Sequence, residues 1–319
     1  MTSQVLIVAR DAAFFAHELG ARFSGLTFHA ALETAGATKV SDGCDILLIR
    51  TDEITAALIE AMPRLRLIQA LTTGTDHIEA LPNLPAGVTI AAARGFHGPA
   101  MSELAFLFML GLARDIRTVL ANQQQHQWDR RPQRLLLGKT VTLVGVGRIA
   151  EELAQRCQRF GMRVEGVASA RTSVPGFDLI HPRTALRQAA AAADFLIVLA
   201  PSTPQNRHLI DAAVLDAMKP SAALINLARG DVVDEAALIR TLTARRIAGA
   251  GLDVFQTEPL PPTSPLWDLP NVLITSHVGG MSDIYGQQVL PLLIDNLTAF
   301  VAGTPERMRF IVRNSNAKG

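Results

Sequence analysis

Residues that can exchange protons and bind carboxylates follow three apolar runs in the second half of the chain. Arg229 comes directly after "AALINLA", Asp253 comes directly after "AGAGL", and His277 stands in "SHVGG" after "NVLIT". An arginine can bind a carboxylate through two hydrogen bonds, and a histidine can donate or accept a proton near neutral pH. A neighbouring carboxylate favours the protonated histidine, and Glu258 is the nearest remaining candidate. These residue types predict acid–base chemistry on a substrate that carries a carboxylate.

A glycine-rich turn in "TVTLVGVGRIAEELAQRC" lies between an apolar run and a helix-like stretch. Gly145, Gly147 and Ala150 fit the pattern G-x-G-x-x-[GA] in the strand-to-helix context that this fingerprint requires. The first glycine allows a tight turn, the second lets backbone N–H groups approach a pyrophosphate, and the helix N-terminus favours negative charge. The turn therefore predicts dinucleotide binding, with Arg148 and Ile149 as part of the site.

The residues that should contact the adenosine ribose lie in "VEGVASARTSVPG". The acidic residue that binds the ribose of NAD normally stands about 20 residues after the glycine-rich turn. Here Ser169, Arg171, Thr172 and Ser173 occupy that region instead. An arginine among hydroxyls suits the 2′-phosphate of NADP, so we expect NADP in preference to NAD. The alternative interpretation of Arg171 is a solvated loop charge.

Short apolar runs alternate with helical stretches along the chain, which is the pattern of parallel sheets built from βαβ units. Such sheets bind their ligands at the carboxyl ends of the strands, so the three residues after the apolar runs should share one edge. Taken singly, each has a structural interpretation as an ion pair, a turn cap or a solvated charge. One long helix is expected over 99–122, followed by a polar connection to a strand at 140. The expected strands are 4–9, 45–49, 65–71 and 87–92, then "TVTLVG", "RVEGVAS", "DFLIVLA", "AALINLA", "AGAGLDVF" and "NVLITS".

Composition limits the class of protein. The 319 residues are 49% hydrophobic, which is enough for two domains with buried cores. Thirty Lys and Arg against 29 Asp and Glu argue against nucleic acid or a membrane surface as the main partner. No apolar run reaches the roughly 18 residues of a spanning helix, and no signal-peptide pattern is present. Two cysteines suit a reducing compartment and offer neither a metal cluster nor a disulfide framework, so we expect a soluble cytoplasmic protein without a metal.

Four longer motifs resemble those of the D-isomer-specific 2-hydroxyacid dehydrogenases. "MSELAF", "LVGVGRIAEELA", "INLARGDVVDEAAL" and "AGLDVFQTEPLPPTSPLWDLPNVLITSHVGG" are similar to successive landmarks of that family, in the same order. The resemblance implies reduction of a 2-oxo acid to a D-2-hydroxy acid by NAD(P)H. It implies that Arg229 contacts the substrate carboxylate and carbonyl, that His277 is the acid/base with Glu258 as its partner, and that Asp253 contacts the nicotinamide carboxamide.

The resemblance also implies two doubly wound parallel-sheet domains. A Rossmann cofactor domain, 99–280, would be inserted into a smaller flavodoxin-like substrate domain formed by 1–98 and 281–319. "TTGTDHI" is similar to the family's substrate-carboxylate loop, which implies that the N–H groups of Gly74 and Thr75 bind the substrate. The first crossing between the domains should contain "ARGFHGPAMSE", whose His97 is either a substrate contact or a packing residue. The cofactor site should also include residues that follow later strands: Ala200, Pro201, Ala228, Asp253, His277 and Gly279.

Two departures from the family pattern affect the expected substrate. Ser276 stands where proline is common before the histidine, which could alter how the backbone presents His277. Asp52 follows Arg50 closely and would repel a phosphate, so a phosphoglycerate substrate is disfavoured. Glyoxylate, hydroxypyruvate and a bulkier 2-oxo acid stay open.

Alternatives to this enzyme exist within the same fold. A non-enzymatic dinucleotide-sensing scaffold is one, and a formate dehydrogenase is another, although Glu258 argues against the latter. We expect a homodimer formed through the cofactor domain. The apolar helix expected over 99–122 is either part of that interface or a core helix.

Overall fold

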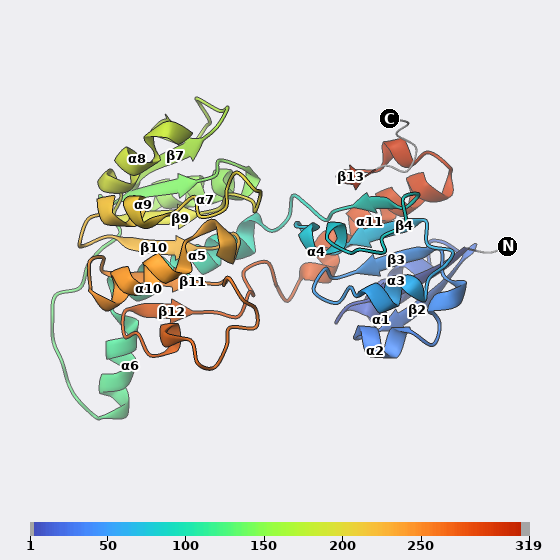
Figure 1. Cartoon of the computed structure of the whole chain (residues 1–319), viewed down its shortest axis with the longest axis horizontal. Helices are drawn as coiled ribbons and strands as arrows, with labels where there is room; N and C mark the ends of the chain where they lie inside the picture. The colour runs from blue at the N-terminus through green and yellow to red at the C-terminus, as the bar shows by residue number, and fades with distance from the viewer. Residues whose placement is uncertain (1–2, 314–319) are drawn as a thin grey trace. The chain divides into compact units, whose positions relative to one another are not determined.

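The computed structural model describes residues 3–313, and the chain divides into two compact units (Figure 1). One unit, called here the split unit, contains the residues up to Phe96 and those from Ser282 on. The other, called the central unit, runs from His97 to Met281. The sequence predicted domain boundaries after residues 98 and 280, whereas the two compact units divide after residues 96 and 281.

The split unit contains a six-stranded sheet of order β13-β5-β4-β3-β1-β2. Its first five strands are parallel and follow the flavodoxin-like order 2-1-3-4-5, whereas β13 pairs antiparallel with β5. α11, red in Figure 1, packs among the N-terminal elements of this unit and contacts α1. The strands are β1 (Ser3–Val8), β2 (Leu26–Ala31), β3 (Ile46–Ile49), β4 (Leu67–Ala70), β5 (Thr89–Ala91) and β13 (Ile311–Arg313). The helices are α1 (Ala12–Gly20), α2 (Thr34–Ala37), α3 (Ala56–Glu60), α4 (Asp76–Glu79) and α11 (Tyr285–Val301).

The central strands of this sheet are apolar along their whole length because both of their faces are covered. Every residue of β3, "ILLI", is fully buried, as expected for a parallel strand between two helical layers. Phe15 of α1 and Leu293 of α11 pack on one face, and Leu58 of α3 packs on the other. Apolar cores on both faces of the sheet therefore fix the positions of the carboxyl ends of β3 and β4.

The central unit contains a seven-stranded parallel sheet of order β12-β11-β10-β9-β6-β7-β8. Numbered within the unit, this is the Rossmann order 3-2-1-4-5-6 with one further strand, and it reverses between β6 and β9. α5 and α7 cover one face, and α8, α9 and α10 cover the other. The strands are β6 (Thr140–Val144), β7 (Arg163–Ala168), β8 (Leu179–Pro182), β9 (Phe195–Val198), β10 (Ala223–Asn226), β11 (Gly249–Leu252) and β12 (Val272–Ile274). The helices are α5 (Gly98–Ala113), α6 (Ile116–Gln124), α7 (Arg148–Arg159), α8 (Leu186–Ala192), α9 (Ala212–Ala217) and α10 (Glu235–Thr243).

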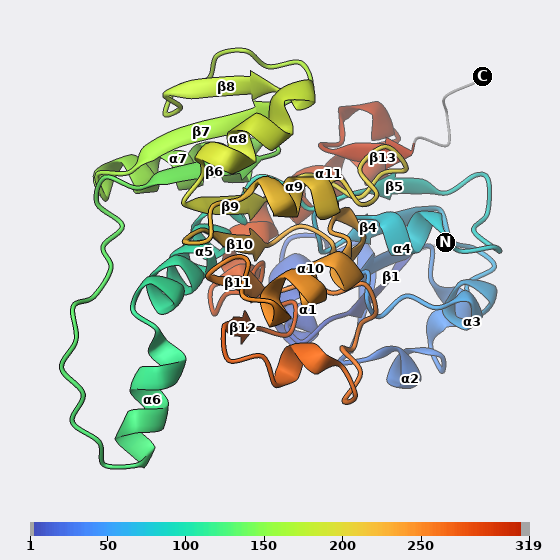
Figure 2. The same ribbon diagram turned by 60° about the vertical axis from the view of Figure 1, so that its left-hand side comes forward.

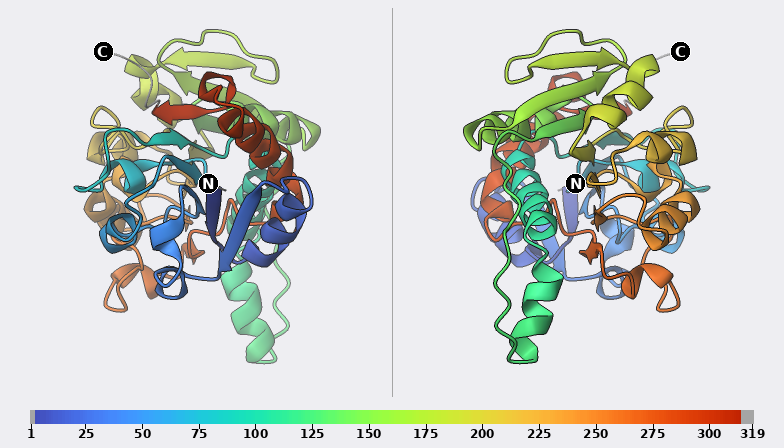
Figure 3. Two further views of the ribbon diagram at one scale, coloured as in Figure 1. Left: turned by 90° about the vertical axis from the view of Figure 1, so that its right-hand side faces the viewer. Right: turned by 90° about the vertical axis from the view of Figure 1, so that its left-hand side faces the viewer.

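The single helix expected over 99–122 is wrong. α5 ends at Ala113, and α6 begins at Ile116 after a break at Asp115, whose φ is +49°. Aspartate tolerates this left-handed conformation better than most residues, and Arg131 binds its carboxylate at 2.9 Å. After the break, α6 and the connection that follows it stand away from the sheet of the central unit (Figure 3).

Three strands were not expected from the sequence: β2, β8 and β13. β2 and β8 are the outer strands of their sheets, and β13 is the opposite edge of the first; Figure 2 shows β8 beyond β7. None contains a buried residue, so none shows the apolar run that marks a central strand. In the part of the chain that the structure describes, no helix is both long and apolar enough to cross a membrane.

Candidate active site

The glycine-rich turn lies at the point where the strand order of the central unit reverses. Gly145 follows β6 with φ of +100°, and a Cβ atom there would lie 2.7 Å from the backbone nitrogen of Ala200, which follows β9. Gly147 caps the N-terminus of α7, and a Cβ atom there would meet nothing within 4 Å. Arg148 and Ile149 form the first turn of α7, and Pro201 follows Ala200. The turn therefore presents a helix N-terminus beside open space.

The segment after β7 holds the hydroxyls and the arginine expected near a ribose. Ser169, Arg171 and Thr172 are all exposed. Arg171 Nη1 donates hydrogen bonds to the carbonyl oxygen of Val146 at 3.1 Å and to Glu151 Oε1 at 2.5 Å. The arginine is thus attached to the glycine-rich turn, and a carboxylate of α7 that the sequence did not single out lies against it.

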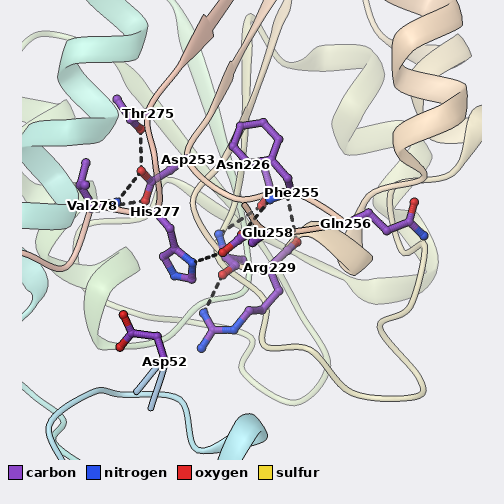
Figure 4. A network of polar contacts seen from close by, with 12 residues as sticks. Asp52, Asn226, Arg229, Asp253, Phe255, Gln256, Glu258, Thr275, His277 and Val278 are labelled. Atoms are coloured by element: carbon purple, nitrogen blue, oxygen red, sulfur yellow. Dashed lines mark hydrogen bonds and ion pairs between the residues drawn. The ribbon is translucent and has the colours of Figure 1, made fainter. Parts of the chain in front are cut away.

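Asp253, directly after β11, organises the loop that follows β12. Its carboxylate is buried and accepts hydrogen bonds from Thr275 Oγ1 at 2.5 Å, from Val278 N at 2.9 Å and from Gly279 N at 2.9 Å. Its carbonyl oxygen accepts the N–H of His277 at 2.8 Å. Figure 4 shows the contacts of this side chain with Thr275 and Val278. These contacts make Asp253 an anchor for the loop, and its expected contact with nicotinamide stays a prediction.

His277 is held in an uncommon backbone conformation. Its φ is +54°, in the left-handed region that costs a non-glycine residue about 1–3 kcal/mol. The hydrogen bonds from His277 N and Val278 N to Asp253 maintain this conformation. The half-exposed imidazole contacts Glu258 Oε2 through Nδ1 at 2.7 Å. The bond at Nδ1 orients the ring and points Nε2 away from Glu258.

The charge state of Glu258 follows from its surroundings. Partial burial alone would raise the pKa of its carboxyl group. The hydrogen bonds from His277 and from Phe255 N, with the positive charges of His277 and Arg229, outweigh burial and lower that pKa below its ordinary value. The Phe255 bond measures 2.9 Å. Glu258 is therefore a carboxylate throughout the physiological pH range.

Arg229 is positioned by a turn that closes directly after β10. Asn226, almost fully buried at the strand end, donates from Nδ2 to Arg229 O at 3.0 Å and accepts from Ala228 N at 3.1 Å. The next residue, Gly230, lies so close to the following loop that a Cβ atom there would be 1.9 Å from the carbonyl carbon of Phe255. This contact joins the arginine turn to the loop that carries Glu258.

The structure thus brings Arg229, Glu258 and His277 into one polar network at the carboxyl edge of the sheet (Figure 4). Sequence reasoning missed Asn226 and Thr275, which position the network without belonging to a recognised motif. The sequence carried one signal for these two residues, because each is a polar residue that ends or directly follows an expected strand.

The substrate-loop candidates belong to the split unit. Thr75 is buried as the cap of α4, and its hydroxyl lies 2.5 Å from Glu79 Oε1. The carbonyl of Gly74 accepts the hydroxyl of Thr72 at 2.9 Å. Arg94 Nε donates to the carbonyl oxygen of the neighbouring Thr73 at 3.3 Å. These contacts hold the loop after β4 in a defined conformation.

Arg50, Asp52 and His97 are three further residues that the sequence singled out. Arg50 and Asp52, after β3, form a two-point ion pair, with Nε–Oδ1 at 3.1 Å and Nη2–Oδ2 at 2.8 Å. Burial lowers the pKa of His97 to about 4, so its imidazole is neutral near pH 7. A neutral imidazole cannot attract a substrate carboxylate by charge, and His97 lies close to Gly280. Both observations favour the interpretation of His97 as a packing residue over that of a substrate contact.

Comparison with known families gives two matches that together cover most of the chain. Residues 7–169 match the model described as "D-isomer specific 2-hydroxyacid dehydrogenase, catalytic domain". Residues 106–279 match the model described as "D-isomer specific 2-hydroxyacid dehydrogenase, NAD binding domain". The second match contains all of the polar network and the glycine-rich turn.

Individual relatives agree with these matches. A glyoxylate reductase of Korarchaeum cryptofilum is 33% identical over 274 residues, 83% of this chain and 82% of that protein. A D-isomer specific 2-hydroxyacid dehydrogenase family protein of Aeromonas salmonicida superposes with a TM-score of 0.90 at 29% identity, covering 98% of this chain and 99% of that one. An NADPH-dependent glyoxylate/hydroxypyruvate reductase of Sinorhizobium meliloti, solved with NADP and sulfate, superposes with a TM-score of 0.82 at 26% identity, covering 97% and 98%.

Proposed function

Because the chain belongs to the family of D-isomer-specific 2-hydroxyacid dehydrogenases and so transfers a hydride between NAD(P)H and a 2-oxo acid, we propose that it reduces glyoxylate and hydroxypyruvate, with NADPH preferred. The observation that carries the catalytic assignment is the 2.7 Å contact of His277 Nδ1 with Glu258 beside Arg229. Glyoxylate and hydroxypyruvate are the small 2-oxo acids named for the relatives. No comparison favours the dinucleotide-sensing scaffold.

The residues of the central unit fit a dinucleotide. Gly147 leaves room at the N-terminus of α7 for a pyrophosphate, and the close approach of Gly145 to Ala200 forms the adjoining wall at the strand reversal. Arg148, Ile149 and Pro201 would border the pyrophosphate, with Ala228, Asp253 and Gly279 nearer the nicotinamide. Ser169, Arg171 and Thr172 would hold the 2′-phosphate of NADP.

The network supplies the groups that reduction of a carbonyl requires. When bound, NAD(P)H supplies the hydride for the carbonyl carbon. Negative charge that grows on the carbonyl oxygen is neutralised by the proton of His277 Nε2, because Nδ1 is engaged by Glu258. Arg229 binds the substrate carboxylate and fixes the carbonyl near His277. The ionised Glu258 stabilises the imidazolium that donates the proton.

The split unit contributes the other part of substrate recognition in this proposal. The N–H groups of Gly74 and Thr75, in the loop held by Thr72, would bind the substrate carboxylate. Asp52 keeps Arg50 in a two-point ion pair, so that arginine is already neutralised by a carboxylate. A phosphate near Arg50 would be repelled by this carboxylate, which supports a substrate without a phosphate group.

Initial rates of cofactor oxidation test the proposal. NADPH and NADH are each combined with glyoxylate, hydroxypyruvate, pyruvate, phenylpyruvate and 3-phosphohydroxypyruvate. We expect the highest kcat/KM with glyoxylate or hydroxypyruvate, and roughly a tenfold preference for NADPH because charged hydrogen bonds hold its phosphate. Turnover chiefly of the phosphorylated acid would contradict the substrate assignment, and no turnover with any pair would contradict the reaction.

We also propose that the protein is a cytoplasmic homodimer, assembled through the central unit. Both cysteines are buried thiols, which fits a reducing compartment.

Leu107 of α5 is 58% exposed and Phe160 after α7 is 49% exposed, beside a groove of about 480 Å³ between the two helices. α6 buries no residue within the chain, and Trp128 beyond it is 90% exposed. A second copy covering this apolar surface explains why such side chains lie outside the core.

Light scattering tests the dimer. The wild type is expected to have twice the mass of one chain, and Leu107→Asp to have the mass of one chain, because a carboxylate at a closely packed interface stays unpaired. Leu32→Asp is the control, since Leu32 is 70% exposed in the split unit. A wild type of single mass would contradict the assembly.

A further inference from the structure

The arginine assigned to the 2′-phosphate already has an anionic partner in this chain. Arg171 Nη1 lies 2.5 Å from Glu151 Oε1, and the two side chains are 46% and 36% exposed. The same nitrogen donates to Val146 O, within the glycine-rich turn. The guanidinium is therefore fixed at the rim of the cofactor site by one carbonyl and one carboxylate.

Glu151 is suited to this contact by its place on α7. It lies in the first turn of the helix, where the N-terminal end of the dipole favours an acidic side chain. The adjacent Glu152 has a different partner: its Oε1 accepts from Arg156 at 2.9 Å, one turn further along the helix. The two consecutive glutamates thus pair with different arginines. Of the two, Glu151 is the one that contacts the segment after β7.

We propose that Glu151 limits the preference for NADP(H) by competing with its 2′-phosphate for Arg171. With NAD(H) bound, which has no 2′-phosphate, the Glu151–Arg171 pair persists unchanged. With NADP(H) bound, the phosphate must take the guanidinium from the carboxylate, and the carboxylate beside it then repels the phosphate. Glu151 therefore weakens NADP(H) binding selectively and lets the enzyme use both cofactors. This inference rests on the proposed role of Arg171.

The test is a comparison of dinucleotide affinities by calorimetry, without any 2-oxo acid. Glu151→Gln keeps the size of the side chain and removes its charge. We expect Kd for NADP⁺ to fall by about two- to fivefold, the range that exposed ion pairs support, and Kd for NAD⁺ to change by less than twofold. An equal change for both dinucleotides, or none for NADP⁺, would overturn the proposal.

Two control variants separate this inference from the proposed function. Glu152→Gln removes the neighbouring charge, which pairs with Arg156, and should leave the ratio of the two Kd values unchanged. Arg171→Gln should raise Kd for NADP⁺, and adding Glu151→Gln to it should then have less effect than in the wild type. If Arg171→Gln leaves NADP⁺ binding intact, the role of Arg171 is wrong. If it weakens NADP⁺ binding but Glu151→Gln has no effect, only the competition is wrong.

Discussion

Replacing His277 by glutamine is expected to lower kcat for 2-oxo acid reduction by a factor of about 10² to 10⁴, the usual contribution of a general acid. Glutamine can fill the space of the imidazole and keep a polar contact with Glu258, but it cannot donate a proton to a developing alkoxide. The side chain of His277 is 45% exposed, so its loss should not disturb the core. The measurement is kcat under saturating cofactor and substrate.

Glu258→Gln is the matched control, because it leaves the acid in place and removes only the carboxylate that favours the imidazolium. Its loss of kcat should be smaller than that of His277→Gln. The thermal unfolding midpoint should be nearly unchanged in both variants. A His277→Gln enzyme that retains the wild-type rate would show that another group supplies the proton.

Gly230→Ala is expected to destabilise the central unit by roughly 3 kcal/mol or more. The added Cβ atom would lie 1.9 Å from Phe255 C, 2.0 Å from Phe255 O and 2.3 Å from Gln256 N, so two backbone segments must move apart. That movement separates Arg229 from the loop of Glu258, and kcat/KM should fall with stability. A lowering of the unfolding midpoint by roughly 6–12 °C is the expected reading in a thermal scan.

Gly147→Ala gives the contrasting case within the same unit. A Cβ atom at Gly147 would meet nothing within 4 Å, so the unfolding midpoint should stay near that of the wild type. The same atom would occupy the space proposed for the pyrophosphate, so dinucleotide affinity should fall. A stable, active Gly230→Ala variant would mean that the contact between the two loops is not required.

The sequence was most informative where buried strands end. Three apolar runs of the central sheet were followed directly by a glycine or a charged residue, at Gly145, Arg229 and Asp253, and parallel strands place all such ends at one edge. This is why the proximity of Arg229, Glu258 and His277 could be anticipated from the sequence. The same runs predicted parallel sheets built from βαβ units, and the family resemblance implied their doubly wound arrangement. The strand orders and the structural relatives confirm that arrangement.

The features that escaped prediction lack such a local signal. β2 and β8 lie at sheet edges, where no residue of either strand is buried and polar residues interrupt the apolar run that marks a central strand. The break at Asp115 depends on a left-handed residue and on a distant partner, Arg131, inside an otherwise helix-compatible segment. Asn226 holds its own turn through Ala228 and Arg229, and Thr275 binds Asp253, which follows the neighbouring strand. Each was visible in the sequence only as a polar residue at the end of an expected strand, which does not by itself indicate a positioning role.

The buried carboxylate of Asp253 has a consequence for how this loop can change. It holds the segment after β12 mainly through backbone N–H groups, which every residue except proline provides. The side chains at 276 and 278 can therefore be exchanged without loss of the anchor. A library randomised at these two positions would present new side chains beside a histidine whose place in the scaffold is kept. The loop is thus a natural starting point for engineering altered substrate range.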